Sequence, residues 1–486
     1  MEQKQEFKRD LNLLDATMIV VGIMIGSGIF IVSADIARTV GSAGMLLTVW
    51  VVTGVITLIG ALSYGELGGL FPQAGGQYIY LREAFNPLTA FLYGWTFFMV
   101  IQTGSIAAVG VAFAKYLAVL VPGLSEKNVM FSIGSWALSP AQLIAIALIV
   151  FLTWVNTRGV HTGKLVQNTF TFAKIASLAG IIILGLLIGL NHDVVTQNFA
   201  HFWDATWTKT DADNKNIIEV VKLSGMGIVT AIAVAQVGSL FSSDGWNNIT
   251  FAAGEVVNPK RNIPLALTYG TIIVTGLYLL VNVVYIITLP IVGDPHGTTV
   301  VAQGIQFAAS DRVGAASAEV IFPKVGATLM AVLIMISTFG CNNGMILAGA
   351  RCYYAMAKDK LFFNKVGELN TKGTPAWALW LQCIWASLLC LSGKYGDLLD
   401  YVIFAVLLFY IATIVGIFRL RKTMPNAERP IKAIGYPVLP ALYIALATFI
   451  CIVLLIEKPM YTYPGLGIVL LGIPVYYIWK SSARTT

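Results

Sequence analysis

The chain has 486 residues, of which 57% are hydrophobic and only 11% are charged. Soluble proteins carry about 25% charged residues, so this composition excludes a sizeable soluble domain and indicates a helical membrane protein. The net charge of +7 comes from Lys and Arg residues spread over short loops, which argues against nucleic-acid binding.

Twelve apolar segments are long enough to cross a bilayer, which takes roughly 20 residues each. We place them at 12–40, 43–70, 88–120, 140–158, 164–190, 225–256, 263–290, 322–357, 374–393, 397–419, 434–457 and 463–480. The expected fold is an all-α polytopic membrane protein with about 12 transmembrane helices. One membrane domain, 12–480, lies between an N-terminal tail, 1–11, and a C-terminal tail, 481–486.

Positive charge in the short loops sets the expected orientation. Most of the 31 Lys and Arg residues fall on the side that carries both termini, which predicts that both are cytoplasmic. On that side 77–82 is expected to form an interfacial helix. On the other side 300–311 is a candidate outer lid.

The first segment is interrupted by Gly26, Ser27 and Gly28. Unwound backbone inside a membrane is tolerated where it lines a cavity or binding site. A half-helix that begins near Ile29 offers free N–H groups to an anion, and one that ends near Ile25 offers carbonyls to an ammonium group. The break therefore suits both poles of a zwitterion. A Gly-rich contact between packed helices is the alternative interpretation.

The sixth segment has a similar break at Phe241, Ser242, Ser243, Asp244 and Gly245. Asp244 either caps the following half-helix or faces an amine or hydroxyl of the ligand. Phe241 either covers the ligand as a gate or packs between helices. Two such breaks at matching places in two halves of a chain point to the substrate site of a secondary transporter. Each half contains five spans, and because five is an odd number the two halves cross the membrane with opposite orientations. The halves are 12–190 and 225–421, and 434–480 lies outside the repeat.

Two basic residues lie inside apolar segments. A charge inside a membrane helix costs several kcal/mol and usually marks function, which makes Lys174 in the fifth segment a candidate. Snorkelling to an interface is its alternative role. Arg351 in the eighth segment is expected to pair with either Glu66 or Glu255.

Several motifs together resemble one known family. They are Gly-Ser-Gly-Ile-Phe at 26–30, Tyr-Gly-Glu-Leu at 64–67, Phe-x-x-x-Gly-Trp-Asn at 241–247, and Ser-Thr-Phe-Gly at 337–340. They are similar to the L-type branch of the amino acid–polyamine–organocation superfamily, and the resemblance covers nearly the whole chain. It implies a LeuT-type fold with a 5+5 inverted repeat and two extra helices.

The resemblance also implies roles for individual residues. The substrate carboxylate is expected on the amides of Ser27, Gly28 and Ile29. The ammonium is expected on carbonyls of Met24, Phe241 and Asp244, with Ser242 beside them. Gly26, Lys174 and Ser337 are expected to serve gating and coupling: the Lys174 ammonium would replace the sodium ion of related carriers by bonding carbonyls near Gly22 and a hydroxyl such as that of Ser337.

The expected function is secondary transport of amino acids, most of all neutral L-amino acids, across a bacterial inner membrane. Transport is expected to be independent of sodium and to proceed by exchange or together with protons. A small amine, a cationic amino acid or a polyamine is the alternative substrate, and a channel is the alternative class. The four His residues lack metal-ligand spacing, so we expect no enzyme, metal or cofactor.

The expected partners are the amino acid and the lipid bilayer, without nucleic acid. All five Cys residues fall in apolar segments, which favours free thiols. The Cys that joins some relatives to a glycoprotein subunit would lie near 121–139. No Cys occurs there, so we expect no disulfide-linked partner subunit.

Overall fold

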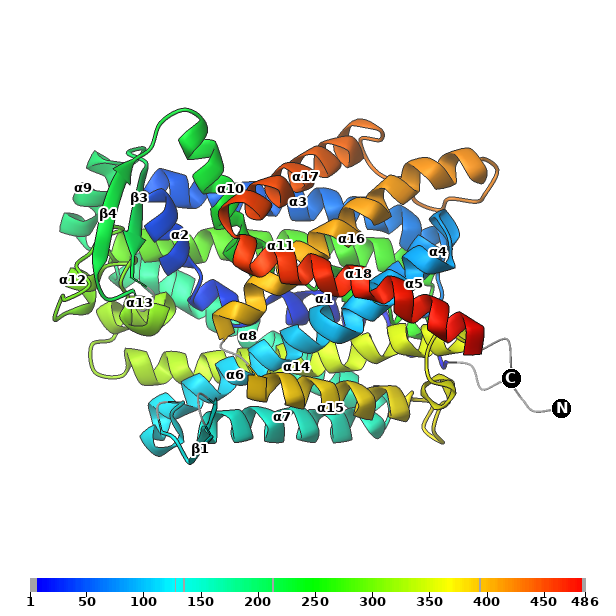
Figure 1. Cartoon of the computed structure of the whole chain (residues 1–486). Helices are drawn as coiled ribbons and strands as arrows, with labels where there is room; N and C mark the ends of the chain where they lie inside the picture. Colours follow the sequence, from blue (N-terminus) through cyan, green and yellow to red (C-terminus); the bar gives the residue numbers. More distant parts are fainter. Residues whose placement is uncertain (1–6, 127, 134–135, 212–213, 393–394, 483–486) are drawn as a thin grey trace.

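The computed structural model describes residues 7–126, 128–133, 136–211, 214–392 and 395–482. Its helices form one bundle (Figure 1). In these ranges nine helices are long and apolar enough to cross a membrane. Three shorter apolar helices, Leu13–Met24, Met226–Ser242 and Ala376–Leu391, account for the rest of the twelve expected segments.

The first half of the described chain contains α1 (Leu13–Met24), α2 (Ser33–Val40), α3 (Ala43–Leu70), α4 (Gln77–Ala84), α5 (Pro87–Thr96), α6 (Gln102–Leu120), α7 (Pro140–Thr157), α8 (Val160–Ile188) and α9 (His192–Ala200). The second half contains α10 (Met226–Ser242), α11 (Pro259–Thr288), α12 (Val300–Gln303), α13 (Val313–Ile321), α14 (Gly326–Lys358), α15 (Ala376–Ser392), α16 (Tyr395–Thr423), α17 (Val438–Glu457) and α18 (Pro459–Ser482).

In the described residues, two short antiparallel strand pairs interrupt the helical pattern. One pairs β1 (Phe131–Ile133) with β2 (Trp136–Leu138), and the other pairs β3 (Thr206–Thr210) with β4 (Ile217–Lys222). Figure 1 shows β3 and β4 beside α9 at one end of the bundle, with α12 and α13 at the same end. Both hairpins lie in connections between long helices, so they leave the spanning part helical.

The two breaks continue differently along the chain. The first continues as a 3-10 turn, Gly28–Phe30, and then as α2. After the second, two 3-10 turns at Trp246–Thr250 and Ala253–Glu255 replace the α-helical half expected up to residue 256. That part of the sixth segment was wrongly predicted to be an α-helix.

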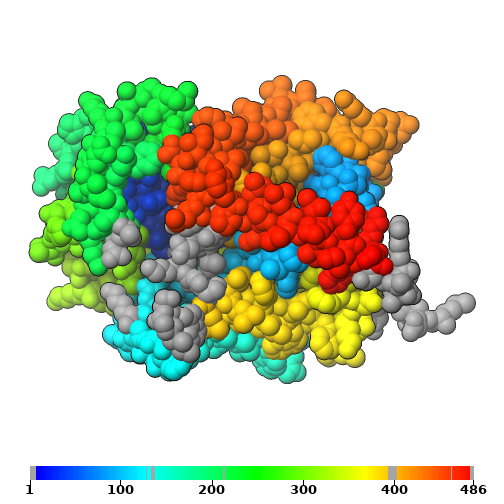
Figure 2. All heavy atoms as spheres, in the orientation of Figure 1, coloured from blue at the N-terminus to red at the C-terminus, as the bar shows by residue number. Residues whose placement is uncertain are grey.

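The broken helices lie in the interior of the bundle. α1 packs against α8, α11 and α14, and α3 packs along α11. On the face shown in Figure 2, α17 and α18, in orange and red, lie over the middle of the bundle, and a small area of the dark blue N-terminal part is visible beside them.

The two ends of the described chain lie close to the last turn of α14. Phe7 stacks edge-on against Tyr354 with ring centroids 4.8 Å apart, and Trp479 stacks on Phe362 with centroids 6.0 Å apart. Both ends therefore lie at the same end of the bundle, as expected for termini that share one side of a membrane.

Two connections differ from their expected form. α4 is a helix as expected, but Gln77 to Leu81 are buried in protein, so it is not an interfacial helix. The expected outer lid near 300–311 contains the short helix α12 and a 3-10 turn at Ala309–Asp311, and α13 comes directly after it. Arg38 of α2 donates to Asp311 and to the Gln306 carbonyl, at 2.7 and 2.6 Å, which fastens this segment to α2.

Candidate substrate site

The first break leaves α-helical geometry directly after α1. Ile25 has φ −77° and ψ 89°, and a 3-10 turn begins at Gly28. The last carbonyls of a helix have no partner within the helix. Here most of their partners are side chains of α8, α11 and α14, and the Met24 carbonyl also accepts the Gly26 amide at 2.9 Å.

Lys174 on α8 is one of these partners. Its ammonium nitrogen lies 2.7 Å from the Gly22 carbonyl oxygen, 2.8 Å from that of Ile25 and 2.8 Å from that of Ser337. A Lys ammonium has three N–H donors, so all of them are used. Lys174 is 1% exposed, which rules out snorkelling to an interface. The single positive charge thus joins α8, the end of α1 and α14.

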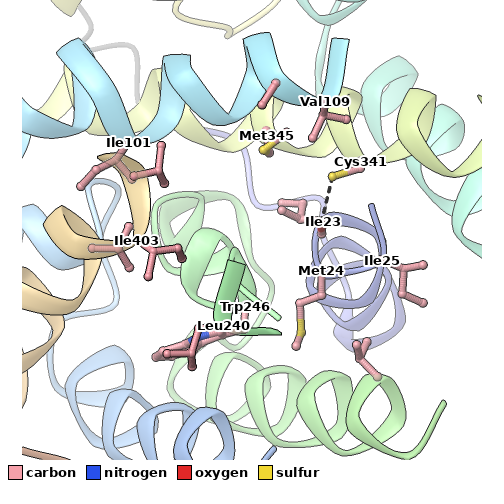
Figure 3. Close-up of a cluster of buried hydrophobic side chains, with 14 of the residues drawn as sticks. Ile23, Met24, Ile25, Ile101, Val109, Leu240, Trp246, Cys341, Met345 and Ile403 are labelled. Atoms are coloured by element: carbon pink, nitrogen blue, oxygen red, sulfur yellow. Dashed lines mark hydrogen bonds between the residues drawn. The ribbon is translucent and has the colours of Figure 1, made fainter. Parts of the chain in front are cut away.

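Ser337 and Cys341 of α14 supply further donors. The Ser337 hydroxyl lies 3.0 Å from both the Ile25 and the Gly26 carbonyl oxygens. The Cys341 sulfur lies 3.0 Å from the Ile23 carbonyl oxygen, the contact drawn as a dashed line in Figure 3. The expected bond from Lys174 to the Ser337 hydroxyl is therefore wrong: Lys174 bonds the Ser337 carbonyl, because the hydroxyl points to the first break.

The second break begins at the end of α10, at Ser242. Gly245 has φ +83°, a left-handed conformation that favours glycine, and the next 3-10 turn starts after it. The breaks touch each other: a Cβ added at Gly28 would lie 2.1 Å from the Ser242 hydroxyl oxygen. Glycine at position 28 is what lets the two unwound segments approach so closely.

A small cavity lies between the two breaks. Its described lining residues are Ile23, Met24, Gly26, Ser27, Gly28, Gln102, Ser105, Val109, Phe241, Ser242, Asp244, Gly245, Asn248, Cys341 and Met345. In Figure 3, Met345 and Cys341 of α14 face Ile23 and Met24 of α1, with Leu240 and Trp246 on a further side. The volume of about 30 Å³ holds a few water molecules, so an amino acid needs the walls to move apart.

Asp244 is the only charged residue among the described ones that line this cavity. Its carboxylate accepts a hydrogen bond of 2.6 Å from the Tyr410 hydroxyl of α16. It also lines two smaller cavities with aromatic walls, one of which includes Trp246 and Tyr443. The carboxylate also accepts a bond from the neighbouring Gly245 amide, and no side chain caps the 3-10 turn that starts after Gly245. Asp244 therefore lies at the cavity wall with its carboxylate held by Tyr410 and by the backbone of the second break.

Most of the predicted site residues come together here. Met24, Gly26, Ser27, Gly28, Phe241, Ser242 and Asp244 all line the cavity. Ile29 lies beyond it, with its carbonyl 3.3 Å from the Tyr285 hydroxyl. Lys174 and Ser337 are not among the lining residues; they bond backbone carbonyls of the first break instead.

Sequence reasoning missed the wall formed by α6 and α14. Gln102 donates to the Met345 carbonyl at 2.7 Å and to the Asn248 side-chain oxygen at 3.2 Å, which joins this wall to the second break. It comes directly after a π-helical turn, Phe97–Ile101, a feature frequent at functional sites. The sequence did contain a signal for Gln102, because it is a lone side-chain amide in an apolar span. Cys341 and Met345 have no comparable feature in the sequence.

The contacts of Arg351 decide between its two expected partners. Arg351 pairs with Glu255, with nitrogen–oxygen distances of 2.9 and 3.2 Å, and both side chains are buried. Glu66 instead binds Arg421 and Arg429. The Glu255 carbonyl also accepts the Asp10 and Leu11 amides, so this pair lies where the chain leading into α1 meets the end of the second break.

Together, the two broken helices and the small cavity between them define an all-helical integral membrane protein with an internal cavity. Comparison with known proteins identifies the family. Residues 11–473 match the amino acid permease family, and the chain belongs to that family. It is therefore an amino acid transporter of the amino acid–polyamine–organocation superfamily rather than an enzyme, and this membership implies the LeuT-type fold.

Two groups of relatives are similar over most of the chain. The mouse b(0,+)-type amino acid transporter 1 is 30% identical over 458 residues, which are 94% of this chain and 84% of that protein. The mouse large neutral amino acids transporter small subunit 2 is 32% identical over 473 residues, 97% of this chain and 81% of that protein. Its human counterpart is also 32% identical, over 97% of this chain and 80% of that protein.

Proposed function

We propose that this protein is a sodium-independent carrier of neutral L-amino acids that works by alternating access, as an exchanger or a proton-linked permease. Its place is the bacterial inner membrane, with both termini cytoplasmic. The observation that carries the proposal is the Lys174 ammonium on the carbonyls of Gly22, Ile25 and Ser337. A fixed positive charge at these carbonyls takes the position that a sodium ion would need.

The proposed substrate site uses the two ends of the first break. The carboxylate binds at the amides of Ser27, Gly28 and Ile29, where a 3-10 turn begins. The ammonium binds at the carbonyl ends of α1 and α10, at Met24 and Phe241, with Ser242 and Asp244 beside it. A small or medium neutral side chain fits the narrow space between Gly28 and Phe241.

A second candidate substrate is an amino acid with a cationic side chain. Asp244 supports it, because within the described parts of the chain its carboxylate has no ion pair and is bonded only by neutral groups, the Tyr410 phenol and the Gly245 amide. The surrounding rings of Trp246 and Tyr410, 5.2 Å apart, and Tyr64 suit a cation as well. An ammonium or guanidinium group would supply the counter-charge that a buried carboxylate requires.

We also propose that the chain works without a disulfide-linked subunit. The connection between α6 and α7 contains no Cys. All five Cys residues are buried as free thiols inside the bundle, where a partner chain has no access to them.

Counterflow in proteoliposomes tests the function. Vesicles containing the purified full-length chain are preloaded with unlabelled amino acids, one at a time from a panel of neutral and cationic ones, and labelled uptake is measured in sodium and in choline buffers. We expect saturable uptake, equal in the two buffers. A clear sodium requirement contradicts the role of Lys174, and uptake that does not saturate indicates a channel.

A further inference from the structure

Basic residues gather at the end of α16 and in the connection that follows it. They are Arg419, Arg421, Lys422, Arg429 and Lys432. Between positions 419 and 432 the sequence contains a single acidic residue, Glu428. Figure 1 shows the connection between α16 and α17 at the end of the bundle where both chain ends lie.

Two of these basic side chains are neutralised and fix the connection in place. Glu66 of α3 is 1% exposed and pairs with Arg421 at 2.6 Å and with Arg429 at 3.1 Å. Its carboxylate also accepts the Ala433 amide at 2.7 Å. One buried carboxylate therefore ties the end of α16 and the connection after it to α3, and it has no capacity left for the other basic residues.

The remaining three basic side chains are exposed, and none has a carboxylate partner among the described residues. They are Arg419, Lys422 and Lys432. The acid of this connection, Glu428, pairs instead with Lys260 of α11 at 2.8 Å. Three positive charges thus stand on a fixed frame, and no carboxylate in the described part of the chain balances them.

An apolar strip continues from these charges along α17, one of the helices long enough to cross a membrane. Ile434 is 61% exposed, and Val438 and Leu442 are 69% and 42% exposed. Val438 and Leu442 are four residues apart and so lie on the same face of α17. Tyr436 packs on Phe418 of α16 with ring centroids 5.0 Å apart, so the strip begins beside the basic residues.

We propose that Arg419, Lys422 and Lys432 bind the headgroup of an anionic phospholipid whose acyl chains lie along Ile434 and Val438. The lipid belongs to the leaflet on the side of the two chain ends. Clusters of Lys and Arg directly beside the end of a transmembrane helix attract anionic lipids. A soluble anion would balance the three charges but would leave the apolar strip uncovered, whereas a phospholipid satisfies both. The inference goes beyond the proposed function and does not depend on which substrate is carried.

A lipid bound here would stabilise a part of the bundle that reaches the cavity. α16 also carries Tyr410, whose hydroxyl bonds Asp244 at 2.6 Å. The connection after α16 is tied to α3 through Glu66. A ligand that binds the folded state and not the unfolded chain raises the stability of the fold. Anionic lipid is therefore expected to raise the Tm of the purified chain more than zwitterionic lipid does.

Native mass spectrometry of the detergent-purified full-length chain tests the site. The chain is mixed with equal amounts of phosphatidylglycerol and phosphatidylcholine that carry the same acyl chains. We expect the wild type to retain phosphatidylglycerol preferentially, and this preference to weaken as salt is added. The triple variant Arg419→Gln, Lys422→Gln, Lys432→Gln should retain at least about tenfold less phosphatidylglycerol, since each basic residue near a membrane surface changes such binding about fivefold. Its retention of phosphatidylcholine should stay unchanged.

Thermal unfolding of the same samples supplies a second measurement and shows that each variant is folded. We expect phosphatidylglycerol to raise the Tm of the wild type and to leave that of the triple variant near its value in phosphatidylcholine. The single variants Lys422→Gln and Lys432→Gln, each at an exposed position, should show a smaller loss of the same kind. A triple variant that retains phosphatidylglycerol like wild type, or a wild type without preference between the two lipids, would overturn the proposal.

Glycerophosphoglycerol, the same headgroup without acyl chains, separates a lipid site from a site for a soluble anion. It should not displace phosphatidylglycerol when the two are present in equal amounts. If it displaces the lipid, or if inorganic phosphate does so at the same concentration, the residues form a soluble-anion site and the proposal is wrong.

The matched control removes the same charge from the connection that follows α14, at the same end of the bundle. It is the triple variant Lys358→Gln, Lys365→Gln, Lys372→Gln. We expect this variant to retain phosphatidylglycerol like wild type, because two of its three ammonium groups lie over the rings of Tyr354 and Trp377. Equal losses in the two triple variants would mean that retention follows total charge, and the site at the end of α16 would be excluded. Since no substrate is used, failure of the proposed transport function leaves this test intact.

Discussion

The two breaks in the bundle are stabilised in different ways. At the first break, the carbonyls of residues 22–26 accept hydrogen bonds from side chains of three other helices, and one of these donors is the buried ammonium of Lys174. At the second break, Gly245 makes a left-handed turn, and the carboxylate of Asp244 points to the cavity with a bond from Tyr410.

This difference suggests a division of labour. Backbone that is held from several sides has a fixed geometry, which suits the carboxylate and ammonium groups that all amino acids share. A side chain at the cavity wall can differ between related carriers without disturbing the backbone. We therefore infer that the first break recognises the common part of the substrate and the second break reads its side chain.

Removing Lys174 tests the first break most strongly. In Lys174→Ala the Gly22, Ile25 and Ser337 carbonyls lose a shared donor, and each buried unpaired group costs about 1–3 kcal/mol. We expect the maximal transport rate to fall at least about a hundredfold. Substrate affinity is expected to fall less, because the ammonium contacts the helix backbone and not the cavity. Uptake kinetics and equilibrium binding are the measurements.

Lys209→Ala is the control for this variant, since it removes an ammonium from the exposed hairpin strand β3. It should transport like wild type. Full activity in Lys174→Ala would show that the first break does not depend on its fixed charge, and the contrast between the two breaks would lose its main support.

The close contact between the breaks is the next point to test. In Gly28→Ala the new Cβ would lie 2.1 Å from the Ser242 hydroxyl oxygen and 2.8 Å from its Cβ. Overpacking of this kind costs about 1–3 kcal/mol, so we expect binding and uptake to fall about tenfold to a hundredfold. Removing the obstacle in the double variant Gly28→Ala, Ser242→Gly should restore part of the activity.

Gly180→Ala on α8 is the matched glycine control, because a Cβ there meets nothing within 4 Å. We expect it to bind and transport like wild type. If Gly28→Ala binds substrate with wild-type affinity, the two breaks do not form one site, whatever the double variant does.

Hydropathy in the sequence was sufficient to locate the spans and both breaks. The span expected at 43–70 is α3 with the same bounds, since a long apolar run leaves little choice. Small polar residues inside such a run mark the breaks. An unwound backbone costs free energy inside a bilayer, so these residues are found there only where the unwound stretch lines a cavity or site. Lys174 was identified for a similar reason: an ammonium inside an apolar helix needs partners.

Other features depend on contacts that one sequence does not encode locally. The stretch from Trp246 to Glu255 is apolar enough for a helix, yet it forms 3-10 turns that are buried among α1, α3 and α11. The sequence offered two acidic residues, Glu66 and Glu255, as partners for Arg351. Arg351 pairs with Glu255 because the packing of α14 brings these two side chains together. Tyr278 looked like an ordinary aromatic residue in the sequence, because its bonds to the Met24 and Ser242 carbonyls form only where the folded chain brings α11 to the ends of the broken helices.

Asp244→Asn tests the second break. The change keeps the size of the side chain and the bond to Tyr410 while it removes the charge. We expect the affinity for cationic amino acids to fall about tenfold, as for a lost charged hydrogen bond, and that for neutral ones to change about twofold or less. Competition of a labelled neutral substrate by lysine, arginine and leucine measures both effects. Unchanged inhibition by all three, with a lower Tm, would assign Asp244 a structural role.

Cys341→Ala gives the smallest effect and tests how the donors of the first break rank. The thiol bonds the Ile23 carbonyl at 3.0 Å, but S–H is a weak donor, so transport should stay within about threefold of wild type. A second measurement uses the position of the thiol. Cys341 lines the cavity, whereas the other four Cys residues do not. A small permeant thiol reagent should therefore inhibit the wild type, substrate should protect it, and Cys341→Ala should resist. If the reagent inhibits Cys341→Ala as much as wild type, the reactive thiol lies elsewhere. If Cys341→Ala loses as much transport activity as Lys174→Ala, the first break depends on its weakest donor as much as on its charged one.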